Sequence, residues 1–538
     1  MRMKFTIVIA ALMAISAHAQ NVTIAVDAAA DRHPIGAGVY GVAFATRAEL
    51  AELNVPLNRS GGNAETRYNW QLNASNRAAD WFFESIGEES AIAGEHADTF
   101  IGDTKAGGAQ AMITIPIVGW VAKLGPNRGK LAAFSVKKYG AQQWTDPYMP
   151  DAGNGVLANG ARVTNNDPND ANQLADENFQ RGWVQHLVSR WGAAANIYVL
   201  DNEHSIWQET HRDVHPIGAT MDEVLSKMTA HAAAIKSVDP NALVAGPEEW
   251  GWSGYILSGY DQQWAAAHDW SSFPDRVAHG GAEYLPWLLA QLRAREQATG
   301  VRLLDIFTVH FYPQGGEYSD DVSTSMQLRR NRSTRALWDP SYKDETWIDE
   351  NVQLIPRMKQ WVATNYPRTK LGITEYNWGA ESHMNGATTQ ADILGIFGRE
   401  GLDYAARWTT PSSTSPAFKA IRMYRNYDGA KSTFGDVSVR ATAPNPDDVS
   451  AFASLRTRDG ALTIMLISKT PGAAKTVTLN VSHFASDGSV QRWQLAENEI
   501  TRVADLSSLT LTLPAQSVTM LVIPPASATP SRRHTAAH

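Results

Sequence analysis

The stretches that decide the fold are Asn196-Ile-Tyr-Val-Leu-Asp-Asn-Glu203-His-Ser-Ile-Trp207 and Lys370-Leu-Gly-Ile-Thr-Glu375-Tyr-Asn-Trp378. Each begins with a short apolar run that is typical of a buried strand, and a glutamate follows directly, Glu203 in the first and Glu375 in the second. A carboxylate at the carboxyl end of a parallel strand occupies the place where a (β/α)8 barrel carries its chemistry. The two stretches therefore predict an α/β fold with two acids at one barrel mouth.

The rest of the chain supports this barrel. From residue 36 to 432, apolar strand-like runs alternate with helix-like segments, which is the pattern of a parallel sheet covered by helices. One helix is indicated by large apolar residues at every fourth position from 179 to 191, and a capping box at Thr220 and Glu223 opens another. Eight strands favour a closed barrel over an open sheet. They are Gly38–Phe44, Val55–Arg59, Ala111–Val118, Ile197–Asp201, Ala242–Gly246, Ile306–Phe311, Leu371–Glu375 and Tyr404–Trp408.

The two ends of the chain predict a second domain. Short β segments separated by turns follow residue 433, and Val22-Thr-Ile-Ala-Val26 near the amino end is also strand-like. We therefore expect a β-sandwich built from both terminal segments. The predicted division is a signal peptide (1–19), an N-terminal sandwich strand (20–35), the catalytic barrel (36–432), the C-terminal sandwich (433–524) and a disordered tail (525–538).

The first residues predict export. A basic start at Arg2 and Lys4, an apolar core and the sequence Ala17-His18-Ala19 together form the pattern of a cleavable secretory leader. This core is too short to span a membrane, and no later stretch approaches a transmembrane helix. We expect a secreted protein, either extracellular or periplasmic, that has no membrane partner.

The composition of the chain limits the kinds of partner and substrate that we expect. The 538 residues include 43% hydrophobic and 19% charged residues, which indicates a globular protein. A net charge of -8 argues against nucleic acid and against polyanionic substrates, because phosphate binding depends on clustered Lys and Arg. Without cysteine, the chain has no disulfide or thiol chemistry. We expect a monomer.

The paired glutamates suit acetal cleavage. A glycosidase needs one carboxylic acid to protonate the leaving oxygen and one carboxylate to stabilise the cationic sugar. Asn202 directly precedes Glu203 and offers an amide for a sugar hydroxyl, while Glu375 suits the ionised role. We expect the retaining arrangement, in which the two carboxyl groups lie about 5–5.5 Å apart. The alternative for either glutamate alone is a salt-bridged barrel residue.

Other residues near predicted strand ends extend the candidate site. Arg59 offers a fixed cation beside a Gly-rich turn that carries Asn63, and His310 and Tyr312 follow another strand, where we expect His310 to orient Glu375. Eighteen tryptophans exceed what a core of this size needs, and an indole face can stack on a sugar ring. The candidate platforms, each of which has a place in the core as its alternative, are Trp70, Trp120, Trp250, Trp252 and Trp378.

Five motifs together resemble glycoside hydrolase family 44, over almost the whole chain from residue 22. They are Asn58-Arg-Ser-Gly-Gly-Asn63 with Thr66-Arg-Tyr-Asn-Trp70, Asp-Asn-Glu203 with Trp207, Gly246-Pro-Glu-Glu-Trp-Gly-Trp252, Val309-His-Phe-Tyr-Pro313 and Ile373-Thr-Glu-Tyr-Asn377. The resemblance implies a TIM-like barrel with a β-sandwich, and a retaining mechanism with Glu203 as acid/base and Glu375 as nucleophile. It implies no cofactor for catalysis and suggests a structural calcium at Asp167 and Asp170, a type of ion that suits oxygen ligands. Many relatives have proline where this chain has His204.

The resulting expectation is a secreted endo-β-1,4-glucanase that acts on xyloglucan, carboxymethyl cellulose or mixed-linkage β-glucan. A second interpretation keeps the barrel and the retaining pair but changes the polysaccharide to xylan, mannan or an arabinoside. A third is a carbohydrate-binding protein without catalytic activity. No separate carbohydrate-binding module is visible, which favours soluble glucans over crystalline cellulose.

Overall fold

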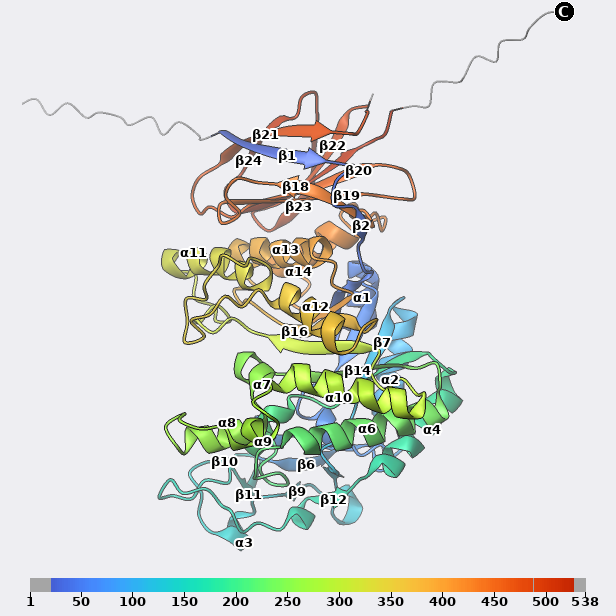
Figure 1. Ribbon diagram of the computed structural model, residues 1–538, viewed down its shortest axis with the longest axis vertical. Coiled ribbons are helices and arrows are strands. Elements are labelled where there is room, and N and C mark those ends of the chain that lie inside the picture. Colours follow the sequence, from blue (N-terminus) through green and yellow to red (C-terminus); the bar gives the residue numbers. More distant parts are fainter. Residues whose placement is uncertain (1–20, 487, 527–538) are drawn as a thin grey trace, which may run out of the picture.

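The computed structural model describes residues 21–486 and 488–526, which form a closed parallel barrel and a separate, mostly antiparallel sheet domain (Figure 1). The predicted signal peptide (1–19) and most of the predicted tail (525–538) lie outside the described residues. Within the described part of the chain, no helix combines the length and the apolar character that a membrane crossing requires.

The barrel contains all eight predicted strands. They close in the order β13-β14-β15-β16-β17-β3-β4-β7, and each strand is parallel to its neighbours. All carboxyl ends therefore open at one mouth, as the strand-end glutamates predict. The strands are β3 (Gly38–Ala43), β4 (Leu57–Ser60), β7 (Gln110–Ile115), β13 (Asn196–Leu200), β14 (Leu243–Glu249), β15 (Ile306–Phe311), β16 (Lys370–Tyr376) and β17 (Tyr404–Arg407).

A helix of seven to 18 residues follows each barrel strand along the chain and covers the outside of the barrel (Figure 1). In the helix predicted around Trp183, this residue and Leu187 are buried. Thr220 caps the next helix by accepting a hydrogen bond from the Glu223 amide, but the Glu223 carboxylate bonds to His215 instead of completing a capping box. The helices are α1 (Arg47–Leu53), α2 (Glu95–Ala106), α4 (Glu177–Trp191), α6 (Met221–Val238), α10 (Tyr284–Thr299), α12 (Leu354–Asn365), α13 (Met384–Arg399) and α14 (Pro416–Arg425).

The sheet domain is built from both ends of the chain, as predicted. Strand β1 lies between β18, to which it is antiparallel, and β21, to which it is parallel. Apolar side chains of β1, β21 and β24 share one core with those of β19, β20 and β25, so the sheet folds over itself as a sandwich. Its strands are β1 (Asn21–Asp27), β2 (His33–Pro34), β18 (Val437–Thr442), β19 (Val449–Leu455), β20 (Leu462–Ser468), β21 (Lys475–Ser482), β22 (Val490–Ala496), β23 (Glu499–Leu506), β24 (Thr510–Leu513) and β25 (Ser517–Ile523).

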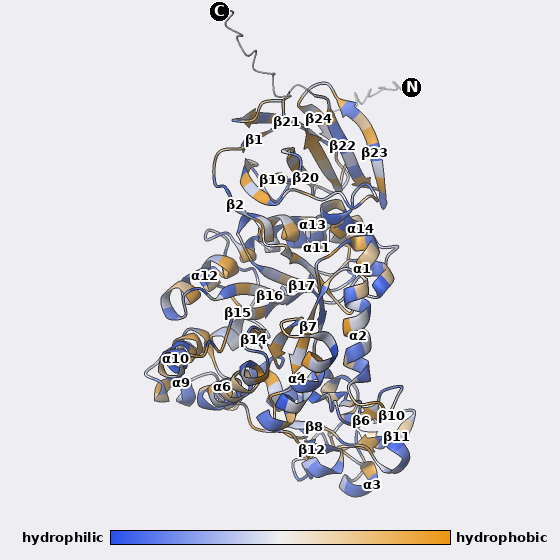
Figure 2. Cartoon of the chain, turned by 90° about the vertical axis from the view of Figure 1, so that its right-hand side faces the viewer, coloured by the Kyte–Doolittle hydropathy of each residue, from blue (hydrophilic) through white to orange (hydrophobic). Residues whose placement is uncertain are grey.

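The two domains share a core through α13 and α14, which lie between the barrel and the sheet (Figure 2). Helix α13 is buried along almost its whole length, which is typical of a helix that is packed on all sides. Phe452, Met465 and Val518 of the sheet belong to the same apolar cluster as the barrel residues Ile393 and Phe397.

The connections after β4 and β7 form a small region at the opposite end of the molecule (Figures 1 and 2). A core of its own holds this region together, in which Phe83 and Phe134 meet edge to face. It contains β5 (Ala74–Asn76), β6 (Glu84–Gly87), β8 (Trp120–Ala122), β9 (Leu131–Ala132), α3 (Val136–Tyr139), β10 (Thr145–Asp146), β11 (Met149–Gly153) and β12 (Asn172–Leu174). Other connections hold α5 (Trp207–Thr210), α7 (Trp252–Ile256), α8 (Gly259–Ala266), α9 (Pro274–Ala278) and α11 (Thr324–Ser333).

Candidate active site

Glu203 and Glu375 meet at the barrel mouth. Glu203 follows β13 in a left-handed backbone conformation, with φ of 49°, while Glu375 lies inside β16 and is paired in register with His310 of β15. One carboxylate oxygen of each glutamate and one nitrogen of His310 all lie within 4.8 Å of one another. The fold therefore brings together two acids that are 172 positions apart in the chain (375 minus 203).

Glu375 is held by two donors. Arg59, fully buried at the end of β4, donates from Nη1 to one carboxylate oxygen at 2.8 Å, and the Tyr312 hydroxyl donates to the other at 2.9 Å. The two bonds engage both carboxylate oxygens, and one of the donors is a guanidinium cation. Arg59 and Tyr312, both predicted site residues, therefore serve Glu375.

Glu203 lies in a different environment. Burial raises the pKa of its carboxyl group, and the hydrogen bond to His310 opposes this shift. The His310 Nδ1 atom lies 2.9 Å from Glu203 Oε1 but 3.6 Å from Glu375 Oε2. The expectation that His310 orients Glu375 is therefore corrected: its closer partner is Glu203. Two carboxyl groups with separate environments are the arrangement that acid catalysis beside an ionised partner needs.

A third carboxylate, Glu248, completes the network. It is fully buried at the end of β14 and accepts hydrogen bonds from Arg59 Nη2 at 2.8 Å and from the Thr374 hydroxyl at 2.7 Å. Its Oε2 atom also lies 2.9 Å from His310 Nε2. Burial would raise the pKa of Glu248, but Arg59 and His310 outweigh it and lower the pKa to about 2. Sequence reasoning missed this role, although Glu248 lies in one of the quoted motifs.

A cavity of 450 Å³ opens above these acids. Among the predicted residues, Asn63, Asn202, Glu203, Tyr312 and Glu375 line it, while Arg59 and His310 lie beneath it. The Asn202 amide oxygen accepts from Arg59 Nη2 at 3.2 Å. The remaining lining residues were not predicted as site residues: Gly62, Asp80, Pro313, Gln314, Tyr318 and Trp408.

Trp408 is the tryptophan of this cavity. It follows β17, with the Arg59 guanidinium 5.6 Å from its ring centre and the Phe44 ring in edge contact at 5.5 Å. Gly62 has φ of 89°, and a Cβ atom there would lie 2.7 Å from the indole, so only glycine fits. The signal that could have identified Trp408 is its place directly after the last barrel strand.

The five predicted tryptophan platforms lie elsewhere. Trp378 is buried, packs on Phe311 and donates to the Ser333 hydroxyl, so its predicted sugar contact is wrong. Trp70 is partly buried, packs against α4, donates to the Phe179 carbonyl and lies outside the cavity lining. The other three are outside the cavity lining: Trp120 on β8, Trp250 after β14 and Trp252 beneath the Arg357 guanidinium.

The predicted calcium ligands do not fit a metal ion as they are arranged. Both Asp170 oxygens accept from Lys138 Nζ, at 2.6 and 2.8 Å, and the Tyr139 hydroxyl adds a third bond. Asp167 caps a turn by accepting from the Asn169 amide at 2.9 Å. A lysine therefore provides the positive charge at this segment, and no calcium ligand set is assembled from Asp167 and Asp170.

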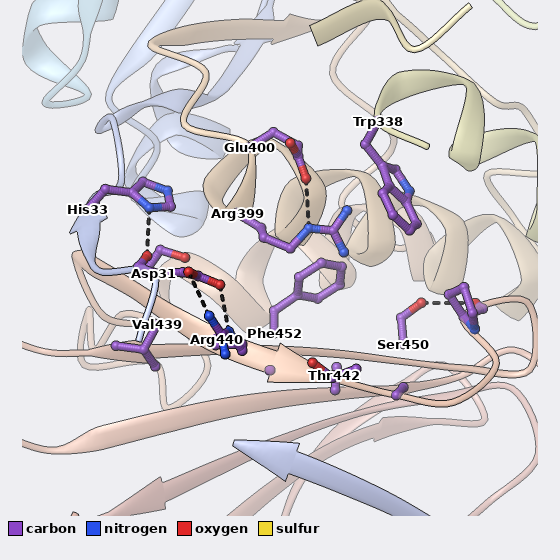
Figure 3. Close-up of a pocket in the computed structure, with 15 residues that line it drawn as sticks. Asp31, His33, Trp338, Arg399, Glu400, Val439, Arg440, Thr442, Ser450 and Phe452 are labelled. Carbon is purple, nitrogen blue, oxygen red and sulfur yellow. Dashed lines mark hydrogen bonds and ion pairs between the residues drawn. The ribbon is translucent and has the colours of Figure 1, made fainter. Parts of the chain in front are cut away.

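A second cavity, of 470 Å³, lies between α13 and the sheet (Figure 3). The Arg399 guanidinium stands between Trp338 and Phe452, 4.1 and 5.5 Å from the two ring centres. Asp31 is paired with Arg440, and Glu400 is paired with Arg399. Because each of its carboxylates is engaged by an arginine, this cavity offers no acid that could protonate a leaving group. The chemistry therefore belongs at the barrel mouth.

Known proteins resemble this chain in sequence and fold. It is 64% identical to CelM2, described as a bifunctional glucanase-xylanase protein from a metagenome library, over 94% of this chain and 99% of that one, with a TM-score of 0.93. A family 44 xyloglucanase of Paenibacillus polymyxa is 27% identical, over 94% of this chain and 100% of that one, with a TM-score of 0.78.

Two further comparisons concern a longer relative and the sequence model of a protein family. The beta-mannanase/endoglucanase A of Caldicellulosiruptor saccharolyticus is 29% identical over 86% of this chain, which spans only 35% of that protein's length. The sequence model of glycoside hydrolase family 44 matches residues 74–315, a segment that contains Glu203 and Glu248. The chain therefore belongs to glycoside hydrolase family 44.

Proposed function

We propose that this protein is a retaining endo-β-1,4-glucanase that hydrolyses soluble β-glucans, with xyloglucan, carboxymethyl cellulose and mixed-linkage glucan as its substrates. The observation that carries the proposal is the approach of Glu203 and Glu375 oxygens to within 4.8 Å. Retaining glycosidases hold their carboxyl groups about 5–5.5 Å apart, whereas inverting enzymes leave about 6.5–9.5 Å for a water molecule. The short separation supports direct attack by one carboxylate.

In the first step, Glu375 attacks the anomeric carbon and Glu203 gives its proton to the leaving glycosidic oxygen. The bond from carbon to that oxygen breaks, and a covalent ester forms between the sugar and Glu375. Arg59 and Tyr312 hold the two Glu375 carboxylate oxygens by hydrogen bonds, while burial raises the pKa of Glu203 and favours its protonated form. The two environments match the two roles.

In the second step, water replaces Glu375 at the anomeric carbon. Glu203, now ionised, takes a proton from this water, so both acids return to their starting states. The product keeps the β configuration because two inversions occur at one carbon. The intact pair of acids favours this reaction over the alternative of an inactive carbohydrate-binding protein.

The cavity surface supports recognition of a polysaccharide through its uncharged sugar hydroxyls. Trp408 offers an indole face, and Asn63, Asn202 and Gln314 offer amides that can both donate to and accept from sugar hydroxyls. The names of the glucanase-xylanase and the xyloglucanase among its relatives favour a glucan, xylan or xyloglucan chain. The residues beneath the cavity need no metal or cofactor for the proposed steps.

The test is reducing-end release from xyloglucan, carboxymethyl cellulose, mixed-linkage glucan, xylan and mannan. Glu375→Gln and Glu203→Gln should each lower turnover on glucans by at least about 1,000-fold, because each removes one of the two chemical roles. Azide should restore activity to a Glu203→Ala variant on an activated aryl glycoside. Glu209→Gln, a change at an exposed surface carboxylate, is the matched control. Full activity in either active-site variant would contradict the assignment.

Xylan cleavage is the second candidate function. A relative 64% identical over 94% of this chain is described as a bifunctional glucanase-xylanase. Xylose lacks the hydroxymethyl group of glucose, so a cleft that accepts glucan also has room for xylan. Xylan turnover that competes with glucan and disappears in Glu375→Gln would assign both activities to one site.

We also propose that the protein is exported through its amino-terminal leader. The basic start, apolar core and Ala17-His18-Ala19 sequence support this proposal. The mature protein should begin at Gln20, which amino-terminal sequencing of the secreted fraction checks. An unprocessed chain retained in the cytoplasm would contradict it.

A further inference from the structure

Glu248 owes its inward position to a bulge in β14. The ladder between β14 and β15 pairs Pro247 with Thr308 and Glu249 with Val309, so Glu248 is left between two ladder positions. Its φ of 60° is in the left-handed region, which costs free energy for a residue with a side chain. The bulge directs this carboxylate toward Arg59 and His310. Bulges commonly re-aim a side chain beside an active site.

Both carboxylate oxygens of Glu248 are occupied by protein groups. Oε2 accepts from Arg59 Nη2 at 2.8 Å and lies 2.9 Å from His310 Nε2, while Oε1 accepts from the Thr374 hydroxyl at 2.7 Å. The side chain is fully buried and does not line the cavity. Glu248 therefore cannot touch a sugar, and any effect that it has on the reaction must pass through its partners.

The partner that links Glu248 to Glu203 is His310. An ionised carboxylate only accepts hydrogen bonds, so the nitrogen facing Glu248 must carry a hydrogen. The other nitrogen, Nδ1, lies 2.9 Å from Glu203 Oε1. We propose that Glu248 is a positioning residue: it keeps the His310 proton on Nε2, so that Nδ1 is free to share the proton of Glu203. This inference rests on the proposed function, in which Glu203 is the acid/base.

The charges around the ring support this arrangement. Glu203 and Glu375 face His310 from β13 and β16, and Arg59 faces it from β4, with the Tyr312 hydroxyl on Glu375. Burial lowers the pKa of His310, but the three surrounding glutamates outweigh this effect and raise the pKa to about 10. The ring together with Glu203 therefore holds two protons at neutral pH, one on Nε2 facing Glu248 and one shared between Nδ1 and Glu203 Oε1.

This arrangement serves both halves of the proposed reaction. While Glu203 is the acid, its shared proton forms the hydrogen bond to Nδ1, and this proton passes to the leaving oxygen in the first step. When Glu203 is to act as an acid again, Nδ1 without a proton accepts its hydrogen bond. Without Glu248, the neutral ring is free to carry its proton on Nδ1, which holds Glu203 in the ionised form and weakens it as an acid. The logic is that of a base oriented by a third group.

The experiment compares two substrates in Glu248→Gln. A cello-oligosaccharide needs protonation of its leaving group, whereas a 2,4-dinitrophenyl β-cellobioside does not. For the variant, kcat/KM on the oligosaccharide should fall by about 100-fold, which is the scale of lost acid catalysis, and kcat/KM on the aryl glycoside should fall less than about 5-fold. The alkaline limb of the kcat/KM profile should move to lower pH, because loss of a neighbouring negative charge lowers the pKa of Glu203.

Glu249→Gln is the matched control, because Glu249 is the adjacent buried acid and bonds to Ser205 instead of His310. It should keep the wild-type ratio between the two substrates. An equal fall on both substrates in Glu248→Gln, or an unchanged ratio, would overturn the proposal. Thermal unfolding of both variants checks folding.

A measurement on the wild-type protein tests the proposal even if the Glu248→Gln variant does not fold. Long-range ¹⁵N–¹H spectra, assigned with His310→Asn, should show Nε2 protonated throughout pH 5–8. A neutral ring with its proton on Nδ1 would overturn the proposal. If wild-type protein cleaves no glycan, the proposed function fails, yet this spectrum still decides the role of Glu248 on the ring.

Discussion

Glu249 is a buried acid that the proposed chemistry does not use. Its side chain lies on the other side of the β14 bulge from that of Glu248, where the Ser205 hydroxyl donates to it at 2.6 Å. Burial raises the pKa of Glu249 to about 8, and the Ser205 bond only partly opposes this shift. At neutral pH the folded protein therefore holds this residue as a neutral acid, while the unfolded chain ionises it.

A pH-dependent stability follows from Glu249. Its folded pKa lies above the unfolded value, so between about pH 4.5 and pH 8 the folded state binds more protons, and stability falls as pH rises. The Glu249→Gln variant has no carboxyl group to ionise at this position and does not lose this stability as pH rises. The difference in free energy of unfolding between the variant and the wild type should therefore shift in favour of the variant by on the order of 3 kcal/mol from pH 5.5 to pH 8. Urea unfolding across this pH range measures it.

The control for this prediction is Glu209→Gln, at an exposed carboxylate that pairs with Arg162. It should leave the pH dependence of stability close to that of the wild type, because exposed pairs contribute little. A pH-independent difference between Glu249→Gln and wild type would show that Glu249 is ionised in the folded protein.

At this scale, the sequence predicted the acids better than their surroundings. Glu203 and Glu375 each end an apolar run, a signal that local pattern carries. Glu248 was missed because its inward direction depends on a bulge, and strict alternation along β14 does not reveal one. Trp378 and Trp408 both follow strands, yet one is buried in the core and the other lines the cavity. That choice depends on packing against helices far away in the sequence.

Helix α13 joins the barrel to the sheet at close range. Gly395 faces Phe452 of β19, and a Cβ atom at this position would lie 2.2 Å from the ring. Gly398, three residues later, leaves 3.4 Å to the nearest atom of Ile35. The two glycines share a helix but differ in the space around them.

Gly395→Ala and Gly398→Ala should therefore change stability in opposite directions. The first should lower the free energy of unfolding by about 1–3 kcal/mol, because overpacking outweighs the helix propensity of alanine. The second should raise it by about 0.5–1 kcal/mol, because alanine favours the helix and meets only ordinary contacts. Chemical denaturation measures the free energy of unfolding of both variants. Equal changes in this free energy would contradict the close packing at Phe452.

The sequence predicted the helices and strands whose apolar residues follow a regular pattern. It did not predict the elements that are held by contacts between parts of the chain far apart in sequence. All eight barrel strands and the cap at Thr220 follow from local patterns. The strands between residues 120 and 174 lack such a pattern, because long-range contacts hold them. For example, the carboxylate of Asp201 accepts hydrogen bonds from the amides of Ile117 and Val118 at the start of this connection.

The barrel and the sheet are joined by a buried ion pair as well as by apolar contacts. Lys469 of the sheet domain donates to Asp392 of α13 at 2.5 Å, and both side chains are 2% exposed. The Thr334 hydroxyl also donates to Asp392. Removal of one partner from a buried pair leaves the other charge without compensation, which costs more than the pair itself contributes.

The whole molecule should therefore unfold as one unit, and Lys469→Met should destabilise it by about 3–5 kcal/mol. Urea unfolding followed by far-UV circular dichroism and by loss of glucanase activity should give coincident transitions in wild type and variant. Lys343→Met, which removes an exposed pair with Asp349, should cost less than about 1 kcal/mol. Separate transitions for the sheet and the barrel would contradict a shared core.

The measurement that tests the central claim most directly is the configuration of the first product. Proton NMR of a cello-oligosaccharide during its first minutes of hydrolysis resolves the two anomers before they interconvert. If Glu375 forms a covalent ester and water then displaces it, the β anomer appears first and the α anomer grows only by mutarotation. Initial release of the α anomer would mean a single displacement by water, and it would contradict the assignment of Glu375 as the nucleophile.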